Sequence, residues 1–139
     1  MTQEPQVKQL GAGVTQSWVA DGRIPVFTIP DVNRTAIDVW ANSVLAYIDT
    51  FDPDTQYLIL HDISAAGMAL TPYVRTRSQE LAIACAPLHG RLAAVMSPGP
   101  MSQLVGMFLK HELRQKMRNI TSETFGNRDE AIAWLVELL

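Results

Sequence analysis

The hydrophobic and polar positions along this chain fall into short apolar runs and longer stretches with helical spacing. The clearest run is Tyr57–Leu60, which follows a series of turn residues. A run of this length is too short for a helix and fits a strand that is buried on both faces of a sheet. Helical patterns flank it on both sides. We therefore predict that residues 56–64 contain the central strand, and that this strand leaves the core at His61 and Asp62.

The amino-terminal part of the chain predicts a β-hairpin. Two strand-like segments, 14–19 and 24–29, are separated by the sequence Ala-Asp-Gly-Arg. Asp-Gly between two apolar runs favours a type I′ turn, because that turn needs a positive φ at both central positions. Pro25 is compatible with a strand only at its start or at an unpaired edge. Residues 1–13 are mostly polar and contain glycine, and they predict a loosely ordered lead-in.

Four segments carry apolar residues at the three- and four-residue spacing of an amphipathic helix. The first spans about residues 35–50. The second begins after Thr71, a preferred N-cap, with Pro72 in the first helical position. The third follows a Ser-Pro-Gly-Pro turn, and the fourth follows Asn127, which forms a near capping box with Glu130. The predicted apolar stripes are Ile37, Trp40, Ala41, Val44, Leu45 and Ile48; Val74, Leu81, Cys85 and Leu88; Met101, Leu104, Val105, Phe108, Leu109, Leu113 and Met117; and Ala131, Trp134, Leu135 and Leu138.

Short strands are also predicted at residues 92–96 and 120–125, the second nearer a sheet edge. The resulting order is β-β-α-β-α-β-α-β-α, with an amino-terminal hairpin followed by strands that alternate with helices. This alternation predicts a single α/β domain over residues 14–139, in which the later strands are parallel. Right-handed crossovers would place the helices on one or both faces of the sheet. The pattern alone does not determine the strand order.

Composition narrows the class of protein. A chain of 139 residues with a net charge of −3 predicts one domain and gives no electrostatic basis for binding nucleic acid. The single cysteine, Cys85, excludes an internal disulfide, as is usual in a reducing compartment. No apolar run approaches the roughly 18 residues of a membrane span. The polar first ten residues lack the apolar core of a signal peptide. We therefore expect a cytoplasmic protein that is not an integral membrane protein.

Two stretches of sequence carry a resemblance to a known family. Residues 58–64, Leu-Ile-Leu-His-Asp-Ile-Ser, are similar to a STAS strand that ends in a hydrophobic-Asp-hydrophobic-Ser turn. Residues 124–135 are similar to the Phe, acidic pair, Ala, Trp-Leu ending of bacterial STAS-like domains. With its hairpin-first order of elements, the chain resembles the SpoIIAA-like, or STAS-like, domains related to anti-sigma-factor antagonists. The resemblance implies a βα sandwich of SpoIIAA-like type and a non-enzymatic protein-interaction or regulatory module.

The resemblance also bears on phosphorylation. In phosphorylated members of the family, an Asp-Ser pair lies at the start of the helix after this strand, and the serine is modified. The matching positions here are Leu70 and Thr71. Thr71 keeps a hydroxyl where the helix dipole would favour a phosphate. Leu70 replaces the aspartate and Pro72 follows, so the interpretation of Thr71 as a simple helix cap is favoured.

Several polar residues are predicted to gather at the carboxyl end of the parallel strands. Ligands of open α/β sheets tend to bind at this end, so it is a candidate surface for a protein partner. The alternative is that these residues only form loops and caps, which is the favoured interpretation. The residues are Asp62, Ser64, Thr71, Ser97 and Gly99.

A basic stripe is the second candidate site. Lys110, Arg114 and Arg118 recur every four residues on the third helix, with His111 beside them. A solvated helix face is the favoured interpretation. The alternative is a docking site for an acidic partner or an anionic head group.

The sequence contains no recognisable catalytic, cofactor or metal-binding pattern. His61 and Asp62 are neighbours on a strand, so their side chains should point to opposite faces and cannot form a dyad. Neither a metal-ligand spacing nor a nucleotide-binding glycine motif occurs. An enzyme is therefore less favoured than an interaction module. A third possibility is a carrier of a small apolar or lipid-like ligand, by comparison with the Sec14 domain.

Two expectations concern packing. The third helix carries more apolar residues than one buried stripe needs, which predicts a homodimer. Trp134 of the terminal helix should pack on the sheet, so that its truncation to alanine costs roughly 3–5 kcal/mol.

Overall fold

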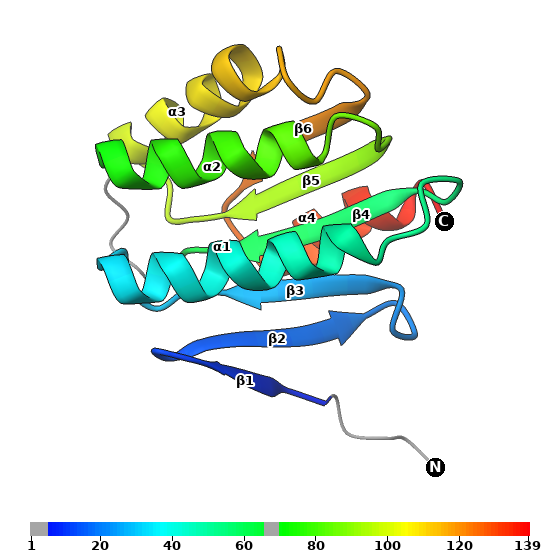
Figure 1. Ribbon diagram of the computed structural model, residues 1–139, viewed down its shortest axis with the longest axis horizontal. Coiled ribbons are helices and arrows are strands. Elements are labelled where there is room, and N and C mark those ends of the chain that lie inside the picture. The colour runs from blue at the N-terminus through cyan, green and yellow to red at the C-terminus, as the bar shows by residue number, and fades with distance from the viewer. Residues whose placement is uncertain (1–5, 66–69) are drawn as a thin grey trace.

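A six-stranded mixed sheet forms the centre of the computed structural model, which describes residues 6–65 and 70–139 (Figure 1). The strands follow one another in space in chain order, from β1 at one edge to β6 at the other. Their bounds are β1 Lys8–Gly11, β2 Val14–Val19, β3 Ile24–Thr28, β4 Tyr57–Asp62, β5 Gly90–Val95 and β6 Ile120–Phe125. Strands β1 to β3 pair antiparallel, and β3 to β6 pair parallel. The predicted α/β class is therefore confirmed.

The predicted hairpin joins β2 to β3. The amide of Arg23 donates a hydrogen bond to the carbonyl oxygen of Ala20 at 3.2 Å. Asp21 and Gly22, the two central residues, have φ of 58° and 81°, as a type I′ turn requires. Pro25 lies near the start of β3, before the parallel pairing with β4 begins at Val26.

The structure differs from the predicted lead-in at Lys8–Gly11, which form β1. The chain reverses through Gly11, Ala12 and Gly13, all of which have positive φ, and it then pairs with β2. Most residues of β1 are exposed. An exposed edge strand needs no apolar alternation, so the hydrophobic pattern gave no sign of it.

Three helices cover one face of the sheet and a fourth covers the other (Figure 1). The bounds are α1 Arg34–Asp49, α2 Pro72–Ala84, α3 Pro100–Met107 and α4 Arg128–Val136. Each connection from β3 to β6 leads to the adjacent parallel strand in the same direction across the sheet, so crossovers of one hand place α1, α2 and α3 on the same face. Helix α4 has no further strand to reach, and it returns beneath β4 and β5.

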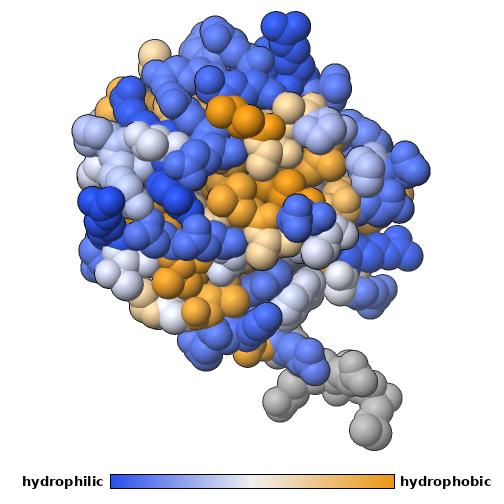
Figure 2. Space-filling model, in the orientation of Figure 1, coloured by the Kyte–Doolittle hydropathy of each residue, from blue (hydrophilic) through white to orange (hydrophobic). Residues whose placement is uncertain are grey.

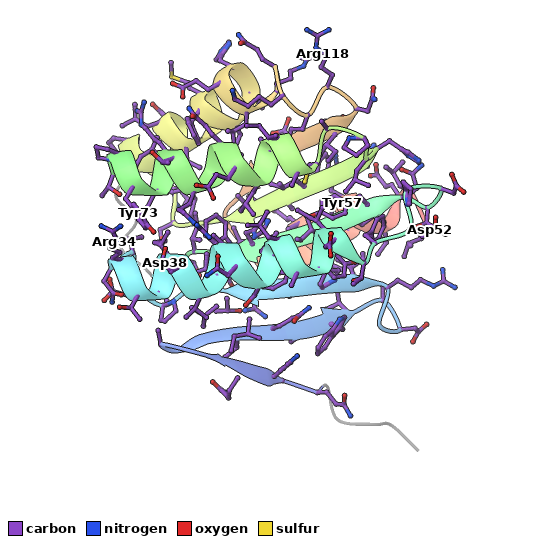
Figure 3. The ribbon with its side chains drawn as sticks, in the orientation of Figure 1. Arg34, Asp38, Asp52, Tyr57, Tyr73 and Arg118 are labelled. Carbon is purple, nitrogen blue, oxygen red and sulfur yellow. The ribbon has the colours of Figure 1, made fainter. Side chains whose placement is uncertain are left out.

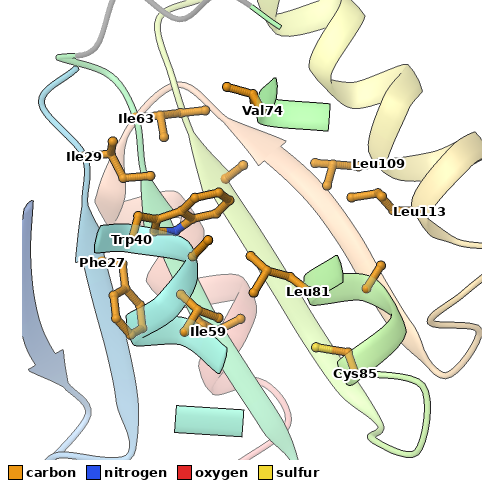
Figure 4. Close-up of a cluster of buried hydrophobic side chains, with 14 of the residues drawn as sticks. Phe27, Ile29, Trp40, Ile59, Ile63, Val74, Leu81, Cys85, Leu109 and Leu113 are labelled. Atoms are coloured by element: carbon orange, nitrogen blue, oxygen red, sulfur yellow. The ribbon is translucent and has the colours of Figure 1, made fainter. Parts of the chain in front are cut away.

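Residues of β4 alternate between the two cores, and all six are buried. Tyr57 and Ile59 pack into the larger cluster under α1, α2 and α3, in which Figure 4 labels Ile59. Leu58 and Leu60 pack into the smaller cluster over α4. The prediction of a central strand is confirmed. The prediction that the strand leaves the core at His61 and Asp62 is wrong: these residues are only 7% and 6% exposed, because strands on both sides and helices on both faces enclose them.

The helix starts follow the sequence closely. The side chain of Asn33 caps α1, the Thr71 hydroxyl accepts a hydrogen bond from the amide of Val74 at 3.1 Å, and Asn127 caps α4. Each cap satisfies a backbone N–H that the first helical turn leaves without an intrahelical partner.

The third helix does not continue as one regular α-helix along its predicted apolar positions. After α3, residues Phe108–Leu113 form a π-helical segment, η1, in which the amide of Arg114 bonds to the carbonyl oxygen of Leu109. Five members of the predicted stripe are buried: Val105, Phe108, Leu109, Leu113 and Met117. Leu104, by contrast, is 49% exposed, and Met107 is 58% exposed. The apolar positions of α3 therefore include a surface that the domain itself does not cover.

Candidate functional site

Helices α1 to α4 all begin near the carboxyl end of the parallel strands, and polar residues collect there. We call this region the sheet-end surface. It consists of Thr28, Asp62, Ser64, Thr71, Ser97, Gly99 and Arg128. Of these residues, Ser64, Ser97 and Arg128 are exposed, while Asp62 is buried beneath them.

Asp62 is the hydrogen-bonding centre of this surface. One carboxylate oxygen accepts from the Ser64 hydroxyl at 2.6 Å and from the Ser64 amide at 3.0 Å. The other accepts from Nε of Arg128 at 2.5 Å. The same guanidinium donates to the Thr28 hydroxyl at 2.8 Å. Three chain segments, the end of β3, the end of β4 and the start of α4, are thus held together by one buried carboxylate.

The surroundings of Asp62 favour its ionised form. Burial by itself would raise the pKa of Asp62, but the hydrogen bonds from Ser64 and Arg128, together with the positive charge of Arg128, lower it below its usual value. A paired carboxylate with a lowered pKa is a poor proton acceptor at neutral pH. Asp62 is therefore suited to fixing the position of Arg128 and Ser64.

The remaining predicted residues of this surface do not join the Asp62 network. Thr71 is half-buried and caps α2, in agreement with the prediction that it is a simple helix cap. Gly99 is the N-cap of α3, and the Ser102 hydroxyl bonds to its backbone at 3.1 and 2.7 Å. Across residues 6–65 and 70–139, no hydrogen bond joins Ser97 or Gly99 to Asp62. Leu70 lies beside Thr71 and lines an apolar cavity.

The sequence did not single out Arg128 or Thr28. Arg128 is 66 residues from Asp62 and 100 from Thr28, so spacing could not connect them. One signal was available. A cation in the first turn of a helix faces the positive end of the helix dipole, which is unfavourable unless a carboxylate lies nearby.

His61 lies on the opposite face of β4, as predicted. Its Nδ1 accepts a hydrogen bond from the indole Nε1 of Trp40 at 3.0 Å, and its ring stacks on Phe27. Burial lowers the pKa of His61 to about 4, because the apolar surroundings disfavour the charged imidazolium. At neutral pH His61 is therefore an uncharged part of the core.

An apolar cavity of about 80 Å³ lies between the sheet and the three helices. Its walls include His61, Trp40, Leu81, Phe108 and Leu113, several of which Figure 4 shows. Figure 2 shows apolar side chains reaching the surface in the middle of this face. An engineered cavity of roughly 150 Å³ is enough to bind benzene, so this smaller cavity admits only a few non-hydrogen atoms unless the helices move apart.

Polar side chains join α1 to α2 on the solvent side of the cavity (Figure 3). The Tyr73 hydroxyl donates to Asp38, and the guanidinium of Arg34 lies 4.4 Å from the centre of the Tyr73 ring. Arg77 of α2 bonds to Asn42 of α1 and forms an ion pair with Asp38 of α1 at 3.9 Å. These contacts hold the two helices together above an otherwise apolar space.

The predicted basic stripe lies along a groove between η1, the turn that follows it and the edge strand β6. Lys110, Arg114 and Arg118 line this basic groove together with Ser122 and Glu123. Arg118 points outward at the end of the sheet opposite the sheet-end surface (Figure 3). Lys110 forms an ion pair with Glu123 at 3.0 Å.

Within the described ranges, no group of three or more His, Cys, Asp or Glu side chains is placed to hold a metal ion. Nor does this part of the chain include a helix that is long and apolar enough to cross a membrane. Comparison of the chain with protein-family models, curated proteins and solved structures gives no match.

Proposed function

We propose that the protein is a non-enzymatic interaction module of STAS-like type that binds a protein partner through the sheet-end surface. The observation that supports this most directly is the Asp62 network, which fixes Arg128 and Ser64 in an exposed position at the end of a rigid sheet. Recognition sites are often carried by loops that a rigid scaffold positions in this way. Arg128, which is 43% exposed in its side chain, would present part of its guanidinium to an acidic group of the partner.

The chemistry of the titratable groups favours binding over catalysis. Asp62 is held ionised and fully bonded, and His61 is neutral, buried and on the other face. General acid–base catalysis needs a group whose pKa lies near the working pH and within reach of a substrate. Neither residue meets that condition, whereas a fixed polar surface meets the needs of recognition.

The state of Thr71 forms part of the proposal. Its hydroxyl already accepts from the amide of Val74, and Leu70 precedes it where phosphorylated STAS proteins have an aspartate. We propose that Thr71 is unmodified and that the surface binds its partner constitutively. A phosphate there would add up to about two negative charges beside the partner site.

The test is capture of the partner from the native cell with the parent protein, followed by measurement of its affinity for variants. Ser97→Tyr places a bulky group on the surface, and Thr71→Asp adds a charge while keeping a capping oxygen. Thr71→Asn is the matched control, because asparagine is an equally good cap without the charge. We expect Ser97→Tyr and Thr71→Asp to weaken binding and Thr71→Asn to leave it unchanged.

The result that contradicts the proposal is equally specific. If the partner binds these variants as it binds the parent, but is lost from the double variant Arg114→Gln and Arg118→Gln, then the docking site is the basic groove. Intact mass measurement of the protein from its native cell tests the state of Thr71, and an added phosphate on that residue would refute constitutive binding.

The apolar cavity supports a second candidate function, the binding of a small apolar ligand. Its walls are almost wholly apolar, and its volume of about 80 Å³ restricts a ligand to a few atoms while α1 and α2 stay joined. A lipid-like chain would have to separate these helices. Native mass spectrometry of the gently purified protein would reveal such a ligand, and an unliganded mass with no stabilisation by benzene or xenon would exclude this use of the cavity.

Self-association is a separate proposal, supported by the exposure of Leu104 and Met107 on α3. We propose that a second copy of the chain covers these residues. Sedimentation at micromolar concentration should show a dimer that Met107→Glu converts to a monomer. A parent protein that sediments only as a monomer would refute the proposal.

A further inference from the structure

We propose that the basic groove is a binding site for a phosphate group, held by Arg114, Arg118 and the hydroxyl of Ser122. The site lies between η1 and β6, at the end of the sheet opposite the sheet-end surface. The phosphate site and the partner-binding surface proposed above can therefore be tested independently of each other.

The path of the backbone gives the groove its shape. Segment η1 is π-helical, with a hydrogen bond from the amide of Arg114 to the carbonyl oxygen five residues earlier. Such segments are rare in helices and frequent at functional sites. The turn after η1 then returns the chain to β6, so that a groove of about 280 Å³ has cations on one wall and strand residues on the other.

The charges in this groove are only partly compensated. Lys110 is paired with Glu123 at 3.0 Å. Among the described residues, no carboxylate forms an ion pair with Arg114 or Arg118, and both are exposed. Three cations and one carboxylate leave a local charge of 3 − 1 = +2, on a chain whose net charge is −3. A concentrated positive charge on an acidic protein attracts a compact anion.

Ser122 supplies the observation that points to a ligand. The residue is 8% exposed, and its hydroxyl has no hydrogen-bond partner within the described part of the chain. A buried hydroxyl without a partner costs free energy, and most buried polar groups in native structures are bonded. Ser122 lines the same groove as the two arginines. An acceptor bound between the arginines would satisfy this hydroxyl.

The donors fit a phosphate group better than a single carboxylate. Two guanidinium groups and one hydroxyl offer more donors than the two oxygens of a carboxylate use. A phosphate group presents at least three acceptor oxygens, and the planar guanidinium matches its geometry with paired hydrogen bonds. The phosphate could belong to a soluble phosphate compound or to the headgroup of an anionic lipid.

The first experiment measures the binding of inorganic phosphate to the full chain by calorimetry, with amide NMR shifts of residues 121–123 as the local readout. Arg114→Gln and Arg118→Gln should each weaken binding at least about tenfold, since a hydrogen bond to a charged group contributes that much. Arg23→Gln is the matched control: it removes the same charge from the exposed β2–β3 hairpin and should leave binding unchanged.

Ser122→Ala separates a ligand contact from a structural role. The variant removes a buried hydroxyl that has no hydrogen-bond partner among residues 6–65 and 70–139, so its denaturation midpoint should equal or exceed that of the parent. Its affinity for phosphate should fall several-fold. If Ser122→Ala binds phosphate as tightly as the parent does, the site is overturned.

The second experiment identifies the source of the phosphate. Phosphatidylcholine vesicles with and without phosphatidic acid are sedimented with the parent and with Arg114→Gln. Binding only to vesicles that contain phosphatidic acid assigns the site to a lipid headgroup, and binding to inorganic phosphate without vesicle binding assigns it to a soluble compound. Failure to bind either probe, or an equal loss with Arg23→Gln, overturns the proposal.

Discussion

His61 and Asp62 are neighbours on β4, but on opposite faces of the sheet one is neutral and the other is ionised. On the three-helix face, the described residues give His61 a hydrogen-bond donor, Trp40, but no charged partner. It adapts to burial by remaining neutral. On the α4 face, Asp62 has Arg128 and Ser64, and it adapts by keeping its charge and bonding both oxygens. Burial alone does not determine the protonation state of a side chain; the partners that share its face do.

The largest expected effect is on the three-helix face, where Trp40 both packs against its neighbours and donates to His61. Trp40 is 8% exposed. Trp40→Ala should lower the free energy of unfolding by about 3–5 kcal/mol, because it opens a large cavity. Urea denaturation would measure this. Trp40→Phe keeps most of the packing but removes the donor, so it should cost less, about 1–3 kcal/mol. Equal costs for the two variants would mean that the hydrogen bond dominates.

The second effect is a pH dependence that belongs to His61. Its pKa falls from 6.5 to about 4 on folding, so between these values the unfolded chain binds a proton that the folded chain does not. Stability is therefore fully present above pH 6.5 and is lost as the pH falls towards 4, by roughly 3 kcal/mol. The pKa of Asp62 is also lowered, but its contribution to stability is lost only at lower pH, below the ordinary aspartate value of 3.8.

His61→Gln separates the contribution of His61 to this pH dependence from that of Asp62. Glutamine offers Trp40 a hydrogen-bond acceptor but does not titrate. Denaturation measured between pH 7 and pH 4 should have a shallower slope in the variant than in the parent. Identical slopes would assign the pH dependence to other groups.

The third effect lies on the α4 face. Arg128→Ala leaves the buried carboxylate of Asp62 without its cation, while the hydrogen bonds from Ser64 remain. Because the arginine side chain is 43% exposed, water replaces part of the interaction, and we expect a loss of about 1–2 kcal/mol. Arg128→Lys should recover part of it. In contrast to the His61 effect, this loss should shrink at a pH where Asp62 becomes protonated. A loss that stays constant down to pH 3 would contradict the pairing.

The last comparison is between the two tryptophans on opposite faces of the sheet. Trp134 is only half-buried; its ring lies 5.4 Å from that of Phe125, and the guanidinium of Arg91 lies 4.7 Å from its centre. It contacts a residue of the sheet, as predicted, but the structure reduces the expected cost of Trp134→Ala from 3–5 to about 2 kcal/mol, since part of the side chain is already exposed to water. A cost that matches that of Trp40→Ala would show that the α4 face is packed as tightly as the other.

The sequence by itself determined the local features of this protein. The order of the elements from Val14 onward, the Asp-Gly hairpin turn, and the caps Thr71 and Asn127 were all readable from it. Each of them depends on residues within a few positions of one another, through backbone dihedral preferences, capping hydrogen bonds and the period of apolar residues. The burial of Tyr57–Leu60 followed for the same reason.

Only the tertiary structure decided the rest. The linear strand order, the edge strand β1 and the π-helical turn of η1 depend on contacts that no local pattern encodes. The pairing of Arg128 with Asp62 joins residues 66 positions apart, and it arises because α4 returns beneath the sheet. Ser122 and Arg118, four positions apart across a turn, acquire a shared groove only when η1 packs against β6. In each case the deciding free energy comes from burying surfaces that are distant in the chain, and it becomes available only once the sheet has formed.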